Sequence, residues 1–194
     1  MEISSTQLKE LRDKTGISVM QCKKALEEAK GDMDKAMVLL KKKGAEVAEK
    51  KSDRAFGAGV IGTYTHNTNE VAALVHLACE TDFVAKNEKF VTLARDIAMQ
   101  VAAMSPRYVK REEVDEQATE AAKAVFAEEV KDKPEELREQ ILSGKMDAYF
   151  KESILLEQPF VKDSEKTIGD MLKEAVQAFG ENIDVLAISR LSIK

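Results

Sequence analysis

The hydrophobic pattern of this chain changes its period between residues 70 and 104. From Glu70 to Cys79 both alternating faces of a strand pattern are largely apolar, with Val71, Ala73, Val75 and Leu77 on one face and Ala72, Leu74, His76 and Ala78 on the other. From about Asn87 to Met104 the apolar residues recur at helical spacing instead. A strand with two apolar faces is typical of the centre of a sheet. We therefore expect a sheet that is packed with helices.

Two further segments are expected to pair with this strand. Residues 60–65 alternate in character and precede a polar turn at residues 66–69, which predicts a β-hairpin. The side chains of residues 183–193 also alternate between two faces, which predicts a strand that joins this hairpin. Together these segments predict an α+β fold with an antiparallel three-stranded sheet and helices on one side of it.

The first fifty residues predict three short helices. Capping residues precede them at Ser4, Ser18 and Asp32, and glycines follow them at Gly16, Gly31 and Gly44. This pattern indicates a compact three-helix bundle over residues 1–51, followed by an α+β domain over residues 52–194. Residues 45–54 are rich in Lys, Glu and Ala, and are either a helical tail or a linker.

The most charged region, residues 112–156, predicts a projecting helical hairpin. Two short apolar stripes are separated near Pro134, which fits the first turn of a second helix better than the interior of one long helix. The first stripe includes Val125 and Phe126, and the second includes Phe150 and Ile154. Residues 158–161 then read as an extended loop, and a helix that starts near Thr167 ends at Gly180.

Composition excludes several classes of function. The net charge is −5 with a pI near 5.3, which argues against direct binding to nucleic acid phosphates. No apolar run approaches the length of a membrane span, and the N-terminus lacks a signal-peptide pattern, so we expect a cytoplasmic protein with no membrane partner. Cys22 and Cys79 are expected to be buried, reduced thiols. The scattered Cys and His residues predict no zinc site, and no cofactor is expected.

The corner segment, residues 79–86, joins the predicted central strand to the following helix and reads Cys-Glu-Thr-Asp-Phe-Val-Ala-Lys. In one interpretation Phe83 points outward beside Asp82 and enters a pocket of a partner. In the other, Thr81 or Asp82 caps a helix and Phe83 packs into the core. Spacing alone favours the second interpretation.

Three groups of residues resemble the elongation factor Ts family. They are Leu11–Gly16 with Met20–Leu26 and Gly31–Asp32, then Thr81–Lys86, and then Leu155–Asp163 with Lys166–Ile168. The resemblance keeps the order of the motifs and covers nearly the whole chain. It implies that the N-terminal bundle is similar to ubiquitin-associated domains and binds the partner. It also implies a short family form with one α+β core, which pairs as a homodimer.

The activity implied by the resemblance is guanine nucleotide exchange on GDP-bound elongation factor Tu, without chemical catalysis. The resemblance implies that Asp82 and Phe83 enter beside the Mg²⁺ site of the partner and that Thr81 and Val84 hold the corner segment. It also points to Met20 and Lys23 as partner contacts. With the three motifs in agreement, the outward interpretation of Phe83 is the one we adopt.

The sequence leaves two alternatives to nucleotide exchange. A three-helix bundle of this kind can serve a non-catalytic protein-binding adaptor. An enzyme is the second alternative, but the sequence shows no nucleophile–base pair, glycine-rich phosphate loop or metal-ligand spacing.

Overall fold

A computed structural model describes residues 3–132 and 134–193 of the chain. The first two residues, which bear on the signal-peptide prediction, lie outside this part. The chain divides into two compact units: Met1–Val60, Leu77–Thr92 and Asp170–Asp184 form the first, and Ile61–His76, Leu93–Gly169 and Val185–Lys194 form the second. The division crosses the long strands and also helix α5 (Glu88–Met104), which it cuts after Thr92. A domain boundary near Lys51 stays a prediction.

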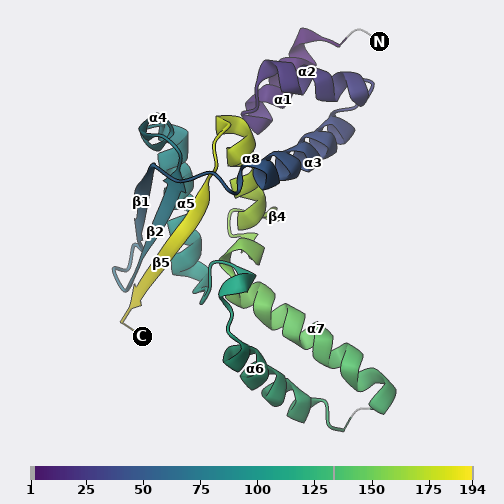
Figure 1. Ribbon diagram of the computed structural model, residues 1–194, viewed down its shortest axis with the longest axis vertical. Coiled ribbons are helices and arrows are strands. Elements are labelled where there is room, and N and C mark those ends of the chain that lie inside the picture. The colour runs from purple at the N-terminus through teal and green to yellow at the C-terminus, as the bar shows by residue number, and fades with distance from the viewer. Residues whose placement is uncertain (1–2, 133, 194) are drawn as a thin grey trace. The chain divides into compact units, whose positions relative to one another are not determined.

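Three helices form the predicted bundle at the start of the first unit (Figure 1): α1 (Ser5–Thr15), α2 (Val19–Glu28) and α3 (Met33–Lys51). Each begins after a side-chain cap, at Ser4, Ser18 and Asp32, as the sequence predicts. The core of the bundle is aliphatic and includes Leu11, Ile17, Cys22, Leu26 and Leu40. Burial of these side chains stabilises helices that are too short to be stable alone.

The prediction that Gly44 ends the third helix is wrong, because α3 continues to Lys51. Helix α8 (Ile168–Phe179) packs against α3 at this glycine. A Cβ atom on Gly44 would lie 2.8 Å from Oε1 of Gln177 in α8. Gly44 therefore permits close packing of two helices instead of a helix end, and residues 45–51 are a helical tail.

The antiparallel sheet has the predicted strands, β1 (Ala58–Thr65), β2 (Val71–Cys79) and β5 (Asp184–Ser192), in the order β1–β2–β5 (Figure 1). The apolar strand β2 is central, as its two apolar faces predict. Helix α5 (Glu88–Met104) covers one face of the sheet. Gly62 of β1 lies directly against Ala94, and Arg190 of β5 donates from Nε to the carbonyl oxygen of Ala102 at 3.0 Å.

The second face of the sheet keeps apolar side chains exposed. Ile61 and Leu74 are exposed, while their strand neighbours Gly62 and Val75 are buried. Arg190 points to α5, and consecutive side chains of a strand point to opposite faces, so the exposed Leu191 points away from α5. We call this set, Ile61, Leu74 and Leu191, the open sheet face.

The helical hairpin of the second unit consists of the short helix η1 (Arg111–Glu113), α6 (Glu116–Glu129), α7 (Glu135–Ser153) and the short helix η2 (Leu155–Glu157). Pro134 is the N-cap of α7, so the chain forms two helices as predicted. The rings of Phe126 on α6 and Tyr149 on α7 pack edge to face, with their centroids 5.8 Å apart. Val125 is exposed, contrary to its place in the predicted stripe, because consecutive helical residues point about 100° apart.

The stretch predicted as an extended loop contains a strand. Pro159–Phe160 (β3) pairs antiparallel with Asp163–Thr167 (β4) in a second, two-stranded sheet. Gln100 of α5 is fully buried; its side-chain amide donates to the carbonyl oxygen of Pro159, and its Oε1 accepts from the amide of Val161. These bonds connect the small sheet to α5.

Candidate functional site

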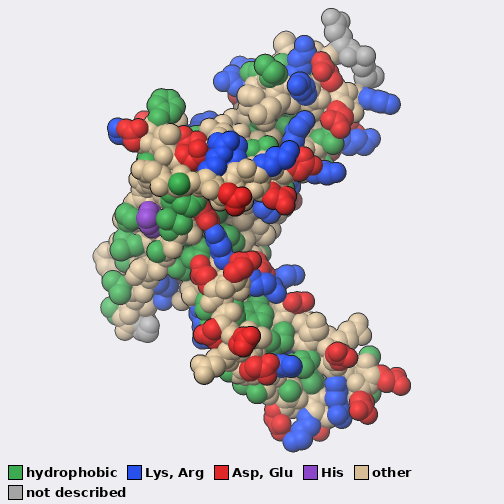
Figure 2. Space-filling model, viewed as in Figure 1, with side chains coloured by type: hydrophobic (Ala, Val, Ile, Leu, Met, Phe, Trp, Pro, Cys, Tyr) green, Lys and Arg blue, Asp and Glu red, His purple; other side chains and the backbone are tan. Residues whose placement is uncertain are grey.

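The corner segment begins where the central strand β2 ends at Cys79 and continues into helix α4 (Asp82–Ala85). Val84 and Ala85 are buried and anchor this short helix. Phe83 lies on the other side of the same turn and is 81% exposed. In Figure 2 a hydrophobic side chain stands clear of its surroundings over α4. The interpretation that places Phe83 in the core is therefore excluded.

Thr81 occupies the N-cap position of α4 with an extended backbone, but its side chain makes no capping bond to the helix. Its hydroxyl donates instead to the carboxylate of Glu181. The hydroxyl thus faces a distant part of the chain, and α4 begins without help from its own N-cap side chain.

Asp82 brings a negative charge next to the exposed ring. Its carboxylate accepts a hydrogen bond from the ammonium of Lys86 at 2.6 Å, and both side chains are exposed. This hydrogen bond and the positive charge of Lys86 lower the pKa of Asp82 below its ordinary value. Asp82 is therefore ionised at neutral pH.

The other two predicted contact residues lie on α2, in the bundle. Met20 is 69% exposed, so its side chain is accessible to a partner. Lys23 is exposed and pairs with Glu27 at 3.8 Å, one helical turn along. The structure thus brings residues 81–84 together on one turn, whereas Met20 and Lys23 belong to a separate helix.

Glu181 belongs to this region, although the sequence did not predict it. Glu181 contacts Thr81, which is 100 positions away in the sequence. The only local signal is that Glu181 follows Gly180, the glycine that ends α8 with a φ of 75°. No spacing rule connects such a loop to a strand–helix corner.

Both cysteines are buried free thiols, as predicted. Burial, together with the nearby charge of Glu181, raises the pKa of Cys79. Within residues 3–132 and 134–193, no three His, Cys, Asp or Glu side chains are grouped in a way that could hold a metal ion. The same residues include no helix with the length and apolar character that a membrane crossing needs.

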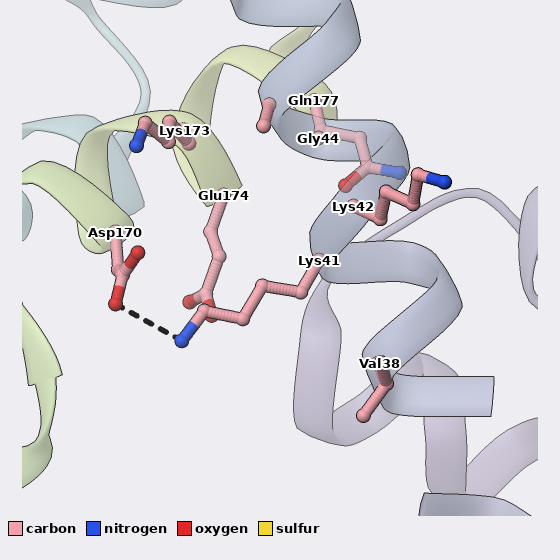
Figure 3. A pocket seen from close by; sticks show the side chains of 9 residues that line it. Val38, Lys41, Lys42, Gly44, Asp170, Lys173, Glu174 and Gln177 are labelled. Carbon is pink, nitrogen blue, oxygen red and sulfur yellow. Dashed lines mark ion pairs between the residues drawn. The ribbon is translucent and has the colours of Figure 1, made fainter. Parts of the chain in front are cut away.

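A pocket of about 330 Å³ lies between α3 and α8 of the first unit (Figure 3). Its charged side chains are of both signs: Lys41 pairs with Asp170 at 3.0 Å, and Lys173 and Glu174 line the same wall. Because acids and bases alternate there, the pocket offers no single charge for an ionic ligand.

The chain is similar to known proteins over nearly its whole length. A family model described as "Elongation factor TS" matches residues 8–193. The chain belongs to the elongation factor Ts family. The elongation factor Ts of Thermosipho melanesiensis is 48% identical over 193 residues, which cover 98% of each chain.

Other members of the elongation factor Ts family are similar over the same length. The protein from Thermotoga neapolitana is 44% identical, over 100% of this chain and 98% of the relative. The protein from Maridesulfovibrio salexigens is also 44% identical, over 100% of this chain and 95% of the relative. The resemblance on the three groups of motifs is therefore confirmed, and this chain is a translation elongation factor by family.

Proposed function

We propose that this chain acts in the cytoplasm as a guanine nucleotide exchange factor for elongation factor Tu in translation elongation, without chemical catalysis of its own. Membership of the elongation factor Ts family supports the activity and the partner. The observation that carries the proposal is the exposed ring of Phe83 beside the ionised Asp82, on a turn anchored by the buried Val84.

The proposed mechanism is displacement of Mg²⁺ on the partner. Bound GDP in a GTPase is held by a backbone cradle and by Mg²⁺ on the phosphate oxygens. Mg²⁺ demands near-ideal octahedral geometry, so a small movement of its ligands weakens its binding strongly. Phe83 and Asp82 enter beside this site and shift the ligands, after which the ion and then GDP leave.

The size of the effect requires more than one side chain. Acceleration of GDP release by three to five decades needs about 4–7 kcal/mol of differential stabilisation. Burial of one Phe side chain contributes only about 1.5–3 kcal/mol. A broad interface must therefore hold the distorted partner, and we assign part of it to the exposed Met20 and Lys23 of the bundle.

Thermodynamic linkage makes the proposed exchange reversible. If this chain weakens the binding of GDP to elongation factor Tu, GDP weakens the binding of this chain by the same factor. Rebinding of nucleotide then ejects the exchange factor. The partner thus returns to its nucleotide-bound form without any reaction on this chain.

Release of a fluorescent GDP from elongation factor Tu tests the proposal. The intact chain is expected to accelerate GDP release. In Phe83→Ala this acceleration should be about ten to a hundred times smaller, because the ring is no longer buried against the partner. Val125→Ala, another exposed apolar side chain, is the matched control and should retain full acceleration. Equal activity of Phe83→Ala and the intact chain would refute the role of the ring.

The same assay addresses the adaptor alternative. The bundle exposes Met20 and also Val38, which is 68% exposed on α3, and such apolar side chains suit protein binding. Binding to elongation factor Tu without any acceleration of GDP release would favour an adaptor over an exchange factor.

We further propose that two chains pair through the open sheet face. Ile61, Leu74 and Leu191 are exposed there, although such side chains normally lie inside. Figure 2 shows hydrophobic side chains gathered with a histidine over the strands. Apposition of two such faces would remove the apolar surface from water and give each core a second sheet.

A further inference from the structure

The corner segment is held by hydrogen bonds from a loop that lies a hundred residues later in the sequence. The carboxylate of Glu181 accepts from the backbone amides of Glu80 and Thr81, each at 3.0 Å, and from the hydroxyl of Thr81. One half-buried side chain therefore binds three donors on the two residues that precede α4. Hydrogen bonds to an ionised acceptor are stronger than those between neutral groups.

The attachment is reciprocal. The carboxylate of Glu80 accepts from the backbone amide of Asn182 at 2.6 Å and also faces the guanidinium of Arg54 at 3.4 Å. Each of the two glutamates thus binds the backbone next to the other. These four hydrogen bonds to the two carboxylates fix the corner segment and the 180–182 loop to each other.

The same loop is attached to the end of α3. The buried side-chain amide of Asn182 donates to the carbonyl oxygens of Ser52 and Arg54, at 3.2 and 2.9 Å. The ammonium of Lys51 donates to the carbonyl oxygen of Gly180. The 180–182 loop is therefore held from two sides and gives Glu181 a fixed base.

Helix α4 needs an external attachment. It has only four residues, Asp82–Ala85, and a helix of one turn is unstable by itself. Its N-cap side chain, Thr81, makes no capping bond to the helix and donates to Glu181 instead. The direction in which Phe83 projects thus depends on the position of Thr81, two residues earlier.

We propose that Glu181 is a positioning residue for nucleotide exchange, which fixes Thr81 so that Phe83 and Asp82 project in the orientation that enters the partner. This inference rests on the proposed exchange function. Glu181 acts through the corner segment and does not itself reach the nucleotide. A side chain that is already oriented loses less conformational entropy on binding, so more of the contact energy remains for distortion of the partner.

The test is Glu181→Gln in the full chain, measured by release of fluorescent GDP from elongation factor Tu over a range of factor concentrations. Gln keeps the size of the side chain but loses the charge and one acceptor oxygen. The maximal release rate is expected to fall about ten- to a hundredfold, as a misplacement near 1 Å can cause. The half-saturating concentration should change less than the rate, since most of the interface is unaltered. An unchanged maximal rate would overturn the inference.

A double-mutant cycle separates positioning from a general structural role. If Glu181 acts through Phe83 and Asp82, Glu181→Gln should slow exchange clearly less in Phe83→Ala than in the intact chain, because only the positioning of Asp82 is then left to lose. Additive losses would overturn the inference while leaving the proposed function intact. Failure of the proposed function is seen separately, since Phe83→Ala would then be as active as the intact chain.

Thr81 supplies a second set of variants, which carries the test even if Glu181→Gln unfolds. Thr81→Val removes only the hydroxyl donor to Glu181 and should lower the maximal rate, whereas Thr81→Ser keeps that donor and should restore most of it. Equal rates for Val and Ser would count against the inference. Glu165→Gln, an exposed glutamate of β4, is the matched control and should exchange normally.

Discussion

Among single residues, two phenylalanines of the first unit show how position separates roles. Phe83 is exposed on α4, while Phe90 on α5 is fully buried and meets Phe179 edge-to-face at 5.9 Å. The same side chain thus serves an outward contact at one position and the core at the other. Their substitutions should separate activity from stability.

We expect Phe83→Ala to leave the thermal midpoint within about 2 °C of the intact chain, because exposed substitutions change stability little. Phe90→Ala should lower the free energy of unfolding by about 3–5 kcal/mol, because it leaves a cavity in the core. Calorimetry of both variants checks this contrast. A large loss of stability in Phe83→Ala would mean that the ring supports the fold.

For Asp82 we expect that the charge, and not its ion pair with Lys86, is needed for exchange. Asp82→Ala should slow GDP release about tenfold, as loss of one charged contact does. Lys86→Met removes the ion pair but keeps the carboxylate, and should exchange at least as fast as the intact chain. Parallel losses in the two variants would show that the pair acts as a unit. Neither change should unfold the chain, since both side chains are exposed.

At the level of helices and strands, two glycines show opposite reasons for the absence of a side chain. Gly62 in β1 lies against the backbone of Ala94 in α5, and an added Cβ would also lie 2.8 Å from the Cβ of Ala94. Gly144 in α7 has no neighbour within 4 Å of the same position. The first glycine is required by packing and the second is not.

These two glycines should respond to alanine with opposite signs. Gly62→Ala should destabilise the chain by about 1–3 kcal/mol or more, because strand and helix must move apart. Gly144→Ala should stabilise it by about 0.5–1 kcal/mol through the better helix propensity of alanine. Urea unfolding of the two variants measures both changes. Stabilisation by Gly62→Ala would show that α5 is not held closely against β1.

Arg111 contributes an ion pair at the base of the helical hairpin, where backbone hydrogen bonds also join Tyr108 to Ser153 and Leu155. Arg111 makes two parallel hydrogen bonds of 2.7 Å to the carboxylate of Glu157, and its guanidinium lies 5.7 Å from the centre of the Phe150 ring. Hydrogen bonding from Arg111 lowers the pKa of Glu157 below its ordinary value. The η1 and η2 segments are thus linked through charge.

This pair predicts a pH dependence. The pKa of Glu157 is lower in the folded chain than in the unfolded chain. The ionised carboxylate therefore stabilises the fold above the unfolded-state pKa, and this stabilisation is lost as the pH falls through the folded-state pKa. Between about pH 5 and pH 3 the thermal midpoint of the intact chain should therefore fall more steeply than that of Glu157→Gln. Identical slopes would show that the ion pair contributes nothing to stability.

For the whole molecule, the open sheet face is the feature that bears on assembly. Leu74 of the central strand β2 is 47% exposed there, beside the exposed Ile61 of β1. Because only one face of this three-stranded sheet is buried within the chain, the other face contacts either solvent or a second chain. We expect the second chain.

Light scattering at high concentration should therefore give the mass of a dimer, and Leu74→Asp should give a monomer because it puts a charge in the apolar contact. Val125→Lys changes an exposed apolar residue of the hairpin and should leave the dimer intact. A monomer mass for the unaltered chain would contradict the proposed pairing.

Several parts of this structure could be predicted from local sequence alone. The caps Ser4, Ser18 and Asp32 and the alternation of β2 act within a few residues, so their structural effect can be read directly. The family motifs located the corner segment in the same way. The interpretation of Gly44 as a helix end failed because a glycine that stops a helix and one that admits a neighbouring helix look the same in sequence.

The sequence by itself determined the three helices of the bundle, the helical hairpin, the three strands of the main sheet with β2 at its centre, and the family. Only the tertiary structure decided which way Phe83 points, because spacing fits either an outward or a buried ring. It also revealed Glu181 as the group that holds Thr81, since that contact joins residues 100 positions apart. The physical reason is the same in both cases: exposure and long-range hydrogen bonds depend on what packs nearby, and local propensity carries no information about it.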